Sequence, residues 1–273
     1  MISNASMAGI VFSLLVSFLV PLILCIVFLR KTHAGIKPVI AGVSIFILFA
    51  LILEQMLHYF ALGYPSPVSE TLNGSPWLYA LYGALAAGFF EEYGRFFAFK
   101  IIIKNNHEWK HGFAYGIGHG GIESWLLLTI TSFSNLTIAN MINSGTEQKL
   151  YEGLAATEAA QLDTLIAQFI TTDSARFFLA GIERVLALIL QIALSLLVLY
   201  AIRKGKYFYF FLAIFIHAAL DLPGALFQKG VVSIWFVEIW LLLFAVGALV
   251  WIVKSQKLMQ EDSAIPAMKL PLA

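Results

Sequence analysis

The chain has 273 residues, of which 60% are hydrophobic and only 12% are charged, and its formal net charge is +1. An ordinary soluble domain carries about 25% charged residues, so this composition excludes a soluble globular protein and predicts an integral membrane protein. The nearly balanced charge argues against a nucleic-acid partner. The single cysteine, Cys25, excludes disulfides within the chain and metal sites built from cysteines.

Seven apolar runs are long enough to cross a hydrocarbon core of about 30 Å, which requires about 20 helical residues. They lie at residues 8–29, 38–62, 77–103, 112–130, 177–200, 207–226 and 231–253. The sequence contains no visible internal repeat and no sign of a second domain. We therefore predict an all-α, polytopic helix bundle that forms one integral membrane domain over residues 1–273.

The positions of lysine and arginine predict how the bundle is oriented, because short cytoplasmic connections are enriched in these residues. The connections after the first, third, fifth and seventh runs are basic, and their residues are Arg30, Lys31, Lys37, Lys104, Lys110, Arg203, Lys204, Lys206, Lys254 and Lys257. The alternate connections are poor in bases. We expect the N-terminus outside and the C-terminus in the cytoplasm of a cell, and we expect that cell to be bacterial.

A polar stretch at about residues 131–176 is the only long connection, and this orientation places it outside. Part of it, from Leu154 to Phe169, has the apolar spacing of an amphipathic helix. We interpret this segment as a structural cap over the bundle in preference to a functional lid.

The third run contains charged residues where a bilayer is expected, namely Glu91, Glu92 and Arg95. Each costs roughly 2.5–3.5 kcal/mol at the centre of a membrane helix on insertion scales. Such residues indicate a reaction centre, an ion path or a buried ion pair that locks neighbouring helices.

Polar residues in two other runs lie at similar depths. At 1.5 Å per helical residue, Glu91 and Glu92 lie roughly 17 Å from the cytoplasmic helix end, His119 about 10 Å and Glu123 about 17 Å. By the same estimate His217 and Asp221 lie roughly 15 and 21 Å deep. The spacing of four residues within each pair, His119 with Glu123 and His217 with Asp221, puts the two side chains on one helix face. Three helices are therefore expected to turn carboxylates and imidazoles towards one place.

Small and rigid residues surround these positions. Five glycines between residues 112 and 121 permit close approach of a neighbouring helix or an extended peptide. Pro223 is expected to end or kink the sixth helix and to free carbonyl groups near the site.

Such a set of residues could carry out hydrolysis. Histidine nitrogens and carboxylate oxygens suit zinc, which needs about three protein ligands plus water in a catalytic site. A glutamate kept off the metal can take a proton from that water and pass it to a leaving amine. In a metal-free variant, a glutamate and a histidine activate water while another histidine stabilises the oxyanion. The residues alone leave both variants open.

The motifs resemble those of the glutamate-dependent intramembrane proteases, the clan of type II CAAX prenyl endopeptidases and bacteriocin-processing proteases. The resemblance rests on Glu91-Glu92-x-x-Arg95, a glycine-rich segment ending in His119, and His217-x-x-x-Asp221, in that order on successive helices. The run Gly118 to Glu123 is most similar to the YhfC-like membrane peptidases. This likeness covers nearly the whole chain and implies a membrane metallo- or glutamate-type endopeptidase.

The resemblance also implies roles for individual residues. Glu91 would activate water, and Glu92 would be a ligand or a positioning acid that Arg95 holds in place. His119 and His217 would be metal ligands or oxyanion stabilisers. Glu92, Glu123 and Asp221 complete the candidate ligand set for a zinc ion, and the substrate would be a membrane protein or a lipidated peptide. Two departures stand out, since the CAAX enzymes place the arginine one residue later and relatives often have asparagine where this chain has Asp221.

Further polar residues remain outside these motifs. Glu54 and His58 lie four apart and are interpreted as an internal pair. Glu183 with Arg184 is interpreted as a structural ion pair or an outer vestibule, and the role of Gln191 is open.

Two other classes of function compete with the peptidase: a proton- or ion-coupled transporter, and a non-catalytic scaffold or immunity protein built on the same bundle.

Overall fold

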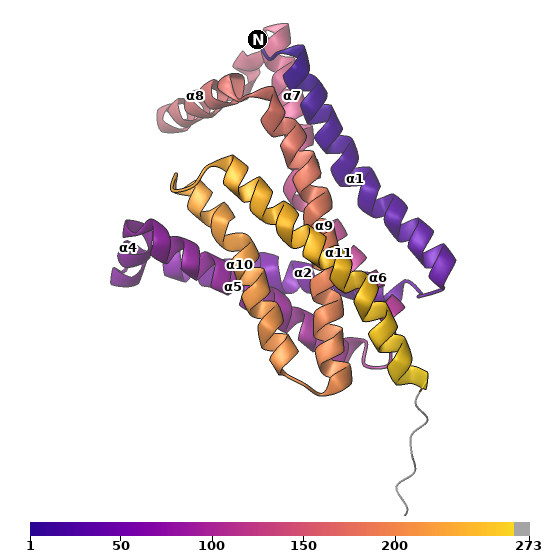
Figure 1. Ribbon diagram of the computed structural model, residues 1–273. Helices are drawn as coiled ribbons and strands as arrows, with labels where there is room; N and C mark the ends of the chain where they lie inside the picture. Colours follow the sequence, from indigo (N-terminus) through magenta and orange to yellow (C-terminus); the bar gives the residue numbers. More distant parts are fainter. Residues whose placement is uncertain (265–273) are drawn as a thin grey trace, which may run out of the picture. The chain divides into compact units, whose positions relative to one another are not determined.

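The computed structural model describes residues 1–264, and in this range the chain is helical almost throughout and forms no strand (Figure 1). The first half contains α1 (Asn4–Thr32), α2 (Lys37–Phe46), η1 (Ile47–Glu54), α3 (Gln55–His58), η2 (Tyr59–Gly63), α4 (Pro67–Gly74), α5 (Pro76–Phe97) and η3 (Ala98–Ile102). The second half contains α6 (Trp109–Ser124), η4 (Trp125–Thr129), α7 (Ile130–Ser144), η5 (Glu147–Tyr151), α8 (Ala156–Thr171), α9 (Ser174–Lys204), α10 (Phe208–Gln228) and α11 (Ile234–Ala264). The all-α prediction is confirmed.

Six helical stretches are long and apolar enough to cross a membrane: 4–32, 37–63, 109–144, 174–204, 208–228 and 234–260. They correspond to six of the seven predicted runs, and the protein is a multi-pass membrane protein. The seventh run forms α5 and η3, which are helical as predicted. Because α5 carries Glu91, Glu92 and Arg95, it is not among the six, and its passage through the membrane stays a prediction.

The chain forms two compact units. The first comprises Met1–Leu22 and Glu123–Val185, and the second comprises Ile23–Ile122 and the chain from Leu186 onward. In the first unit, Ile2, Ile10 and Ala139 form a small buried core, and Asn143 joins α7 to the N-terminal end of the chain by hydrogen bonds with both backbone groups of Ile2. The amphipathic pattern predicted for residues 154–169 corresponds to α8.

The fourth predicted span is longer than expected. Instead of ending at residue 130, the helix continues through α6, η4 and α7 to Ser144, so the polar connection begins later than predicted. Gly145, with a φ of 69°, ends α7, because glycine adopts the left-handed conformation without steric cost.

Close backbone contacts bring the helices of the second unit together. A Cβ atom at Gly88 of α5 would lie 2.7 Å from the carbonyl oxygen of Ile214 in α10, so only glycine permits this approach. Gly116 of α6 similarly faces Ile192 of α9, and a Cβ atom at Gly118 would overlap the backbone carbonyl of Val39 in α2. The predicted role of the glycine run is therefore confirmed, and its neighbours are helices α2 and α9.

Pro223 does not end α10, which continues to Gln228. A proline inside a helix has no N–H to donate, so the carbonyl four residues earlier, that of Ala219, lacks its usual partner. The indole Nε1 of Trp240 in α11 donates to this carbonyl over 2.9 Å. Pro223 therefore frees a carbonyl group as predicted, and this carbonyl accepts a hydrogen bond from α11.

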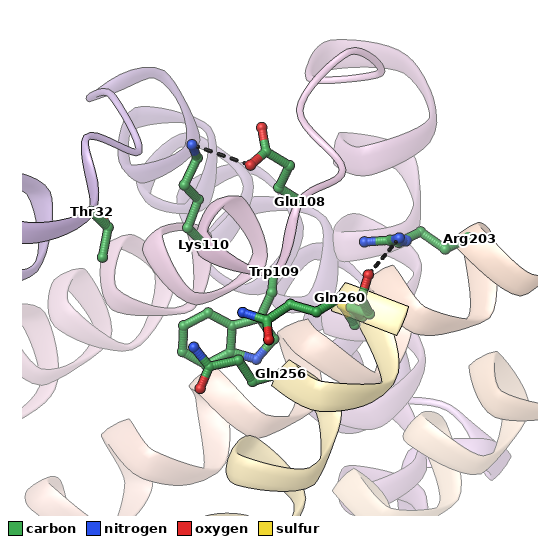
Figure 2. A pocket seen from close by; sticks show the side chains of 8 residues that line it. Thr32, Glu108, Trp109, Lys110, Arg203, Gln256 and Gln260 are labelled. Atoms are coloured by element: carbon green, nitrogen blue, oxygen red, sulfur yellow. Dashed lines mark hydrogen bonds and ion pairs between the residues drawn. The ribbon is translucent and has the colours of Figure 1, made fainter. Parts of the chain in front are cut away.

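Basic helix ends meet in the second unit. A pocket of about 360 Å³ is lined by Thr32, Glu108, Trp109, Lys110, Arg203, Gln256, Met259 and Gln260 (Figure 2). These residues come from the end of α1, the start of α6 with the loop before it, the end of α9 and the last turns of α11. All four connections predicted to be cytoplasmic therefore lie on one side of this unit. The assignment of that side to the cytoplasm stays a prediction.

Candidate active site

The acidic pair and the arginine of α5 form a buried ion cluster in the second unit. Glu92 and Arg95 are fully buried and Glu91 nearly so. Arg95 Nη1 donates to Glu92 Oε1, while its Nη2 lies 3.4 Å from Glu91 Oε2. The guanidinium is thus bound more closely to Glu92 than to Glu91, although both glutamates lie on the same helix.

His217 of α10 reaches this cluster with both ring nitrogens. Its Nδ1 lies 2.6 Å from Glu92 Oε1, and its Nε2 lies 3.9 Å from Glu91 Oε2. The same Nε2 is 3.4 Å from Asp221 Oδ2, one turn later on the helix. The close approach of α5 and α10 at Gly88 positions His217 beside the two glutamates.

His119 of α6 also reaches Glu91. It is fully buried, and its Nε2 lies 2.8 Å from Glu91 Oε2. Phe46 of α2 packs edge-on against the imidazole, with ring centroids 5.1 Å apart. One carboxylate oxygen of Glu91 therefore faces the Nε2 atoms of two histidines that come from two different helices.

Gln191 of α9 is a member of the site whose role the sequence left open. Its side-chain oxygen accepts a hydrogen bond from Arg95 Nη2, and its Nε2 donates to Glu91 Oε2 over 3.3 Å. The signal that could have identified it is an amide in the middle of an otherwise apolar helix. Its partners, however, depend on the rotation of α9 about its own axis, which the sequence does not give.

Glu123 and the polar patch of α9 belong to the first unit. Arg184 lies 3.1 Å from Glu123 Oε1 and also pairs with Glu183. The interpretation of Glu183 and Arg184 as an ion pair is confirmed, and Glu123 is its third member. The role of Glu123 as a metal ligand stays a prediction.

A second polar group lies in the second unit. His58 Nε2 is 3.2 Å from Glu54 Oε1, and His58 Nδ1 is 3.0 Å from the hydroxyl of Tyr82 in α5. The predicted Glu54–His58 pair is confirmed and extends to Tyr82. Glu54 ends the π-helical turn η1, and such turns are frequent at functional sites.

The cluster contains nitrogen and oxygen donor atoms of the kinds that bind metal ions. His217 shows the arrangement usual for a metal-ligating histidine, in which one ring nitrogen is held by a carboxylate while the other faces the site. Here Glu92 holds Nδ1, and Nε2 faces Asp221 and Glu91. In addition, Glu92 Oε2 and His119 Nδ1 are buried polar atoms without a hydrogen-bond partner among the described residues. A buried site needs a partner for every polar atom, and a metal ion is one such partner for nitrogen and oxygen donors.

These features define a class, namely a multi-pass helical membrane protein with a buried glutamate, histidine and arginine cluster. Comparison with known proteins narrows this class to one family. The model of the family described as YhfC intramembrane metalloprotease matches residues 16–242, and the chain is 35% identical over 261 residues to the uncharacterised membrane protein YhfC of Bacillus subtilis strain 168. That alignment covers 95% of this chain and all of the relative. The chain belongs to the YhfC family. No solved structure matches it.

Proposed function

We propose that this protein is an intramembrane endopeptidase that hydrolyses a peptide bond within or near the bilayer, with Glu91 as the group that activates water. The observation that carries the proposal is the convergence of His119 Nε2 and His217 Nε2 on one carboxylate oxygen of Glu91, at 2.8 and 3.9 Å. The description of the family as an intramembrane metalloprotease supports the same class of reaction. The substrate class is a membrane protein or a lipidated peptide.

The two adjacent glutamates have different roles in this proposal. Glu92 Oε1 is engaged by Arg95 and by His217 Nδ1, so Glu92 positions the histidine. Glu91 is less tightly engaged by the guanidinium and faces both imidazoles. It takes a proton from water as the water oxygen bonds to the peptide carbonyl carbon, and it returns that proton to the amine as the C–N bond breaks.

The two histidines either bind a metal ion or stabilise the oxyanion. His119 and His217 would hold the metal ion that the family description implies, which would supply Lewis-acid polarisation of the water and the carbonyl. In the metal-free variant, the same imidazoles stabilise the oxyanion by hydrogen bonds. Gln191 positions the acids in either case, because its amide accepts from Arg95 and donates to Glu91 at the same time.

The proposal is tested by comparing new protein N-termini in membranes of cells that produce wild-type protein, Glu91→Gln or His217→Ala. Glu70→Gln is the matched control, because Glu70 lies in α4, outside the cluster. We expect certain N-termini to appear in cells that produce the wild type or Glu70→Gln. The same N-termini should be absent from cells that produce either site variant. Equal termini in all four samples would refute the peptidase. Zinc that co-purifies with the wild type and is lost in His119→Ala would select the metal form.

The competing function with structural support is proton-coupled transport. The chain of hydrogen bonds from Tyr82 through His58 to Glu54 is of the kind that carries protons in membrane proteins. Glu54→Gln and Tyr82→Phe would then abolish pH-driven uptake into proteoliposomes, whereas a peptidase would produce no such uptake.

A further inference from the structure

The exposure of polar side chains in the second unit falls in one direction along the helices that carry them. On α10, the side chain of Asp221 is 43% exposed, while that of His217, one turn earlier, is 5% exposed. On the helix that runs through α2, η1 and α3, the side chain of His58 is 23% exposed and that of Glu54 is 8% exposed. Each helix thus has an exposed polar group at one level and a buried one at the next.

Helix α5 shows the same order. Tyr82 is partly exposed, the side chain of Glu91 is 10% exposed, and that of Arg95 is fully buried. The carboxylate of Glu54 lies close enough to Glu91 and His217 for their charges to interact. The polar groups of the three helices therefore form one continuous set that leads to Glu91.

The exposed members of this set lie towards the end of the second unit that carries α4. Helix α4 joins the end of η2 to the start of α5, and Lys229, just after α10, lies over the ring of Tyr79 near the start of α5. His58, Tyr82 and Asp221 each lie about 10 Å or less from these helix ends. The basic pocket in Figure 2 includes the end of α9, which precedes the start of α10, so it lies at the opposite end.

Apolar and aromatic side chains close the cluster towards the basic helix ends. Phe99, one turn beyond Arg95, and Tyr115, one turn before His119, are fully buried, and their ring centroids are 4.8 Å apart. Ile103, one turn further along the chain from Phe99, is also fully buried. The cluster is therefore sealed towards the basic ends and open towards the α4 end.

The exposed carboxylate of Asp221 indicates that water fills this opening. Helix α10 has 21 residues and is about 31 Å long, close to the hydrocarbon core of about 30 Å. Asp221 therefore lies about 10 Å below the edge of that core. A carboxylate exposed to lipid is costly, so ionisable residues in membrane helices face the bundle interior or a water-filled cavity. The exposed part of Asp221 consequently faces water at this depth.

We propose that the glutamate and histidine cluster receives its water and its substrate from the α4 end of the second unit. The entrance is formed by His58, Tyr82 and Asp221, and Glu54 leads from it to Glu91. This end is predicted to lie outside the cell, so the substrate is a membrane protein or lipidated peptide whose scissile bond lies in or near the outer leaflet. The substrate class rests on the proposed peptidase function, whereas the entry of water does not.

Cysteine accessibility tests the direction of entry without any peptidase activity. Tyr82→Cys, Asp221→Cys and Tyr115→Cys are made singly in the full-length chain with Cys25→Ser, which removes the natural thiol. A charged, membrane-impermeant methanethiosulfonate is applied to spheroplasts or to inverted membrane vesicles, which expose opposite faces of the membrane. This reagent modifies only thiols that water reaches.

Two exposed positions mark the two sides. Val231→Cys marks the α4 end, since Val231 follows α10, and Lys206→Cys marks the opposite end, since Lys206 lies between α9 and α10. We expect Tyr82→Cys and Asp221→Cys to be modified from the same side as Val231→Cys and from that side only. Tyr115→Cys should be modified from neither side.

Modification of Tyr82→Cys and Asp221→Cys from the side of Lys206→Cys, or from neither side, would overturn the proposal. Modification of Tyr115→Cys from the side of Lys206→Cys would also overturn it, because the cluster would then be open towards the basic ends. Tyr82 and Asp221 lie on different helices, so one folded entrance variant is sufficient, and thermal melting identifies it.

The substrate class is tested by the positions of the new N-termini that wild-type protein produces and Glu91→Gln does not. We expect these termini in segments of membrane proteins on the side from which Val231→Cys is modified. Termini confined to segments on the other side would overturn the substrate class. The absence of any such termini would refute the proposed peptidase instead, and the labelling result would still decide how water enters.

Discussion

Replacement of Arg95 by methionine should destabilise the protein strongly. Arg95 is fully buried and donates to Glu92 and Gln191, and it lies 3.4 Å from Glu91. Methionine has similar length but no charge, so Arg95→Met leaves two adjacent carboxylates buried without their counter-ion. Breaking a buried ion pair from one side costs about 3–5 kcal/mol, which corresponds to a hundredfold or larger change in the unfolding equilibrium.

This cost is measured by equilibrium unfolding in mixed micelles, in which the proportion of a denaturing detergent is raised stepwise. Lys110→Met is the control, because Lys110 pairs with the exposed Glu108 over 3.2 Å and such a pair contributes about 0–1 kcal/mol. The double variant Glu92→Gln with Arg95→Met should cost less than Arg95→Met alone, since it also removes one carboxylate charge. If Arg95→Met costs no more than Lys110→Met, the cluster is solvated and our account of it is wrong.

Three further predictions follow from single contacts. Gly118→Ala should destabilise or misfold the protein by forcing α6 away from α2, whereas Gly83→Ala, where a Cβ atom meets nothing within 4 Å, should melt like the wild type; equal melting of both variants would contradict the close contact. Trp240→Phe should cost about 1–3 kcal/mol by leaving the Ala219 carbonyl unpaired, and Pro223→Ala should reduce that cost by restoring the helical N–H, so an unchanged cost in the double variant would refute the role of the indole. Gln191→Leu should lower the turnover number of substrate cleavage with little change in KM, and Gln191→His, which can still donate and accept, should recover part of it; an unaltered turnover number in Gln191→Leu would remove Gln191 from the site.

The helices could be predicted from the sequence, because a bilayer imposes length and apolarity on any helix that crosses it. All seven runs are helical. The prediction was less accurate at residue 130, since Thr131 and Asn135 are polar yet continue the helix to Ser144. Polar composition marks where a helix leaves the apolar environment, but it does not mark where the helix ends.

The convergence of Glu91, His119 and His217 could also be predicted, because depth and the spacing of four residues constrain where charged side chains can point. The hydrogen bonds that Arg95 donates to Glu92 and Gln191 could not be predicted. They depend on which rotamers the arginine and glutamine adopt and on how closely α9 approaches α5, and a sequence motif gives neither. Likewise, a sequence motif cannot show that Glu123 is engaged by Arg184.

The most direct test of the central claim is cleavage by the purified protein in liposomes. A membrane substrate found by the comparison of N-termini is reconstituted with wild-type protein or with Glu91→Gln, and the new peptide N-terminus is measured over time. We predict that the wild type produces this terminus and that Glu91→Gln reduces its rate at least a hundredfold, in the range expected when a general base is lost. Cleavage by Glu91→Gln at the rate of the wild type would contradict the assignment of Glu91 as the group that activates water.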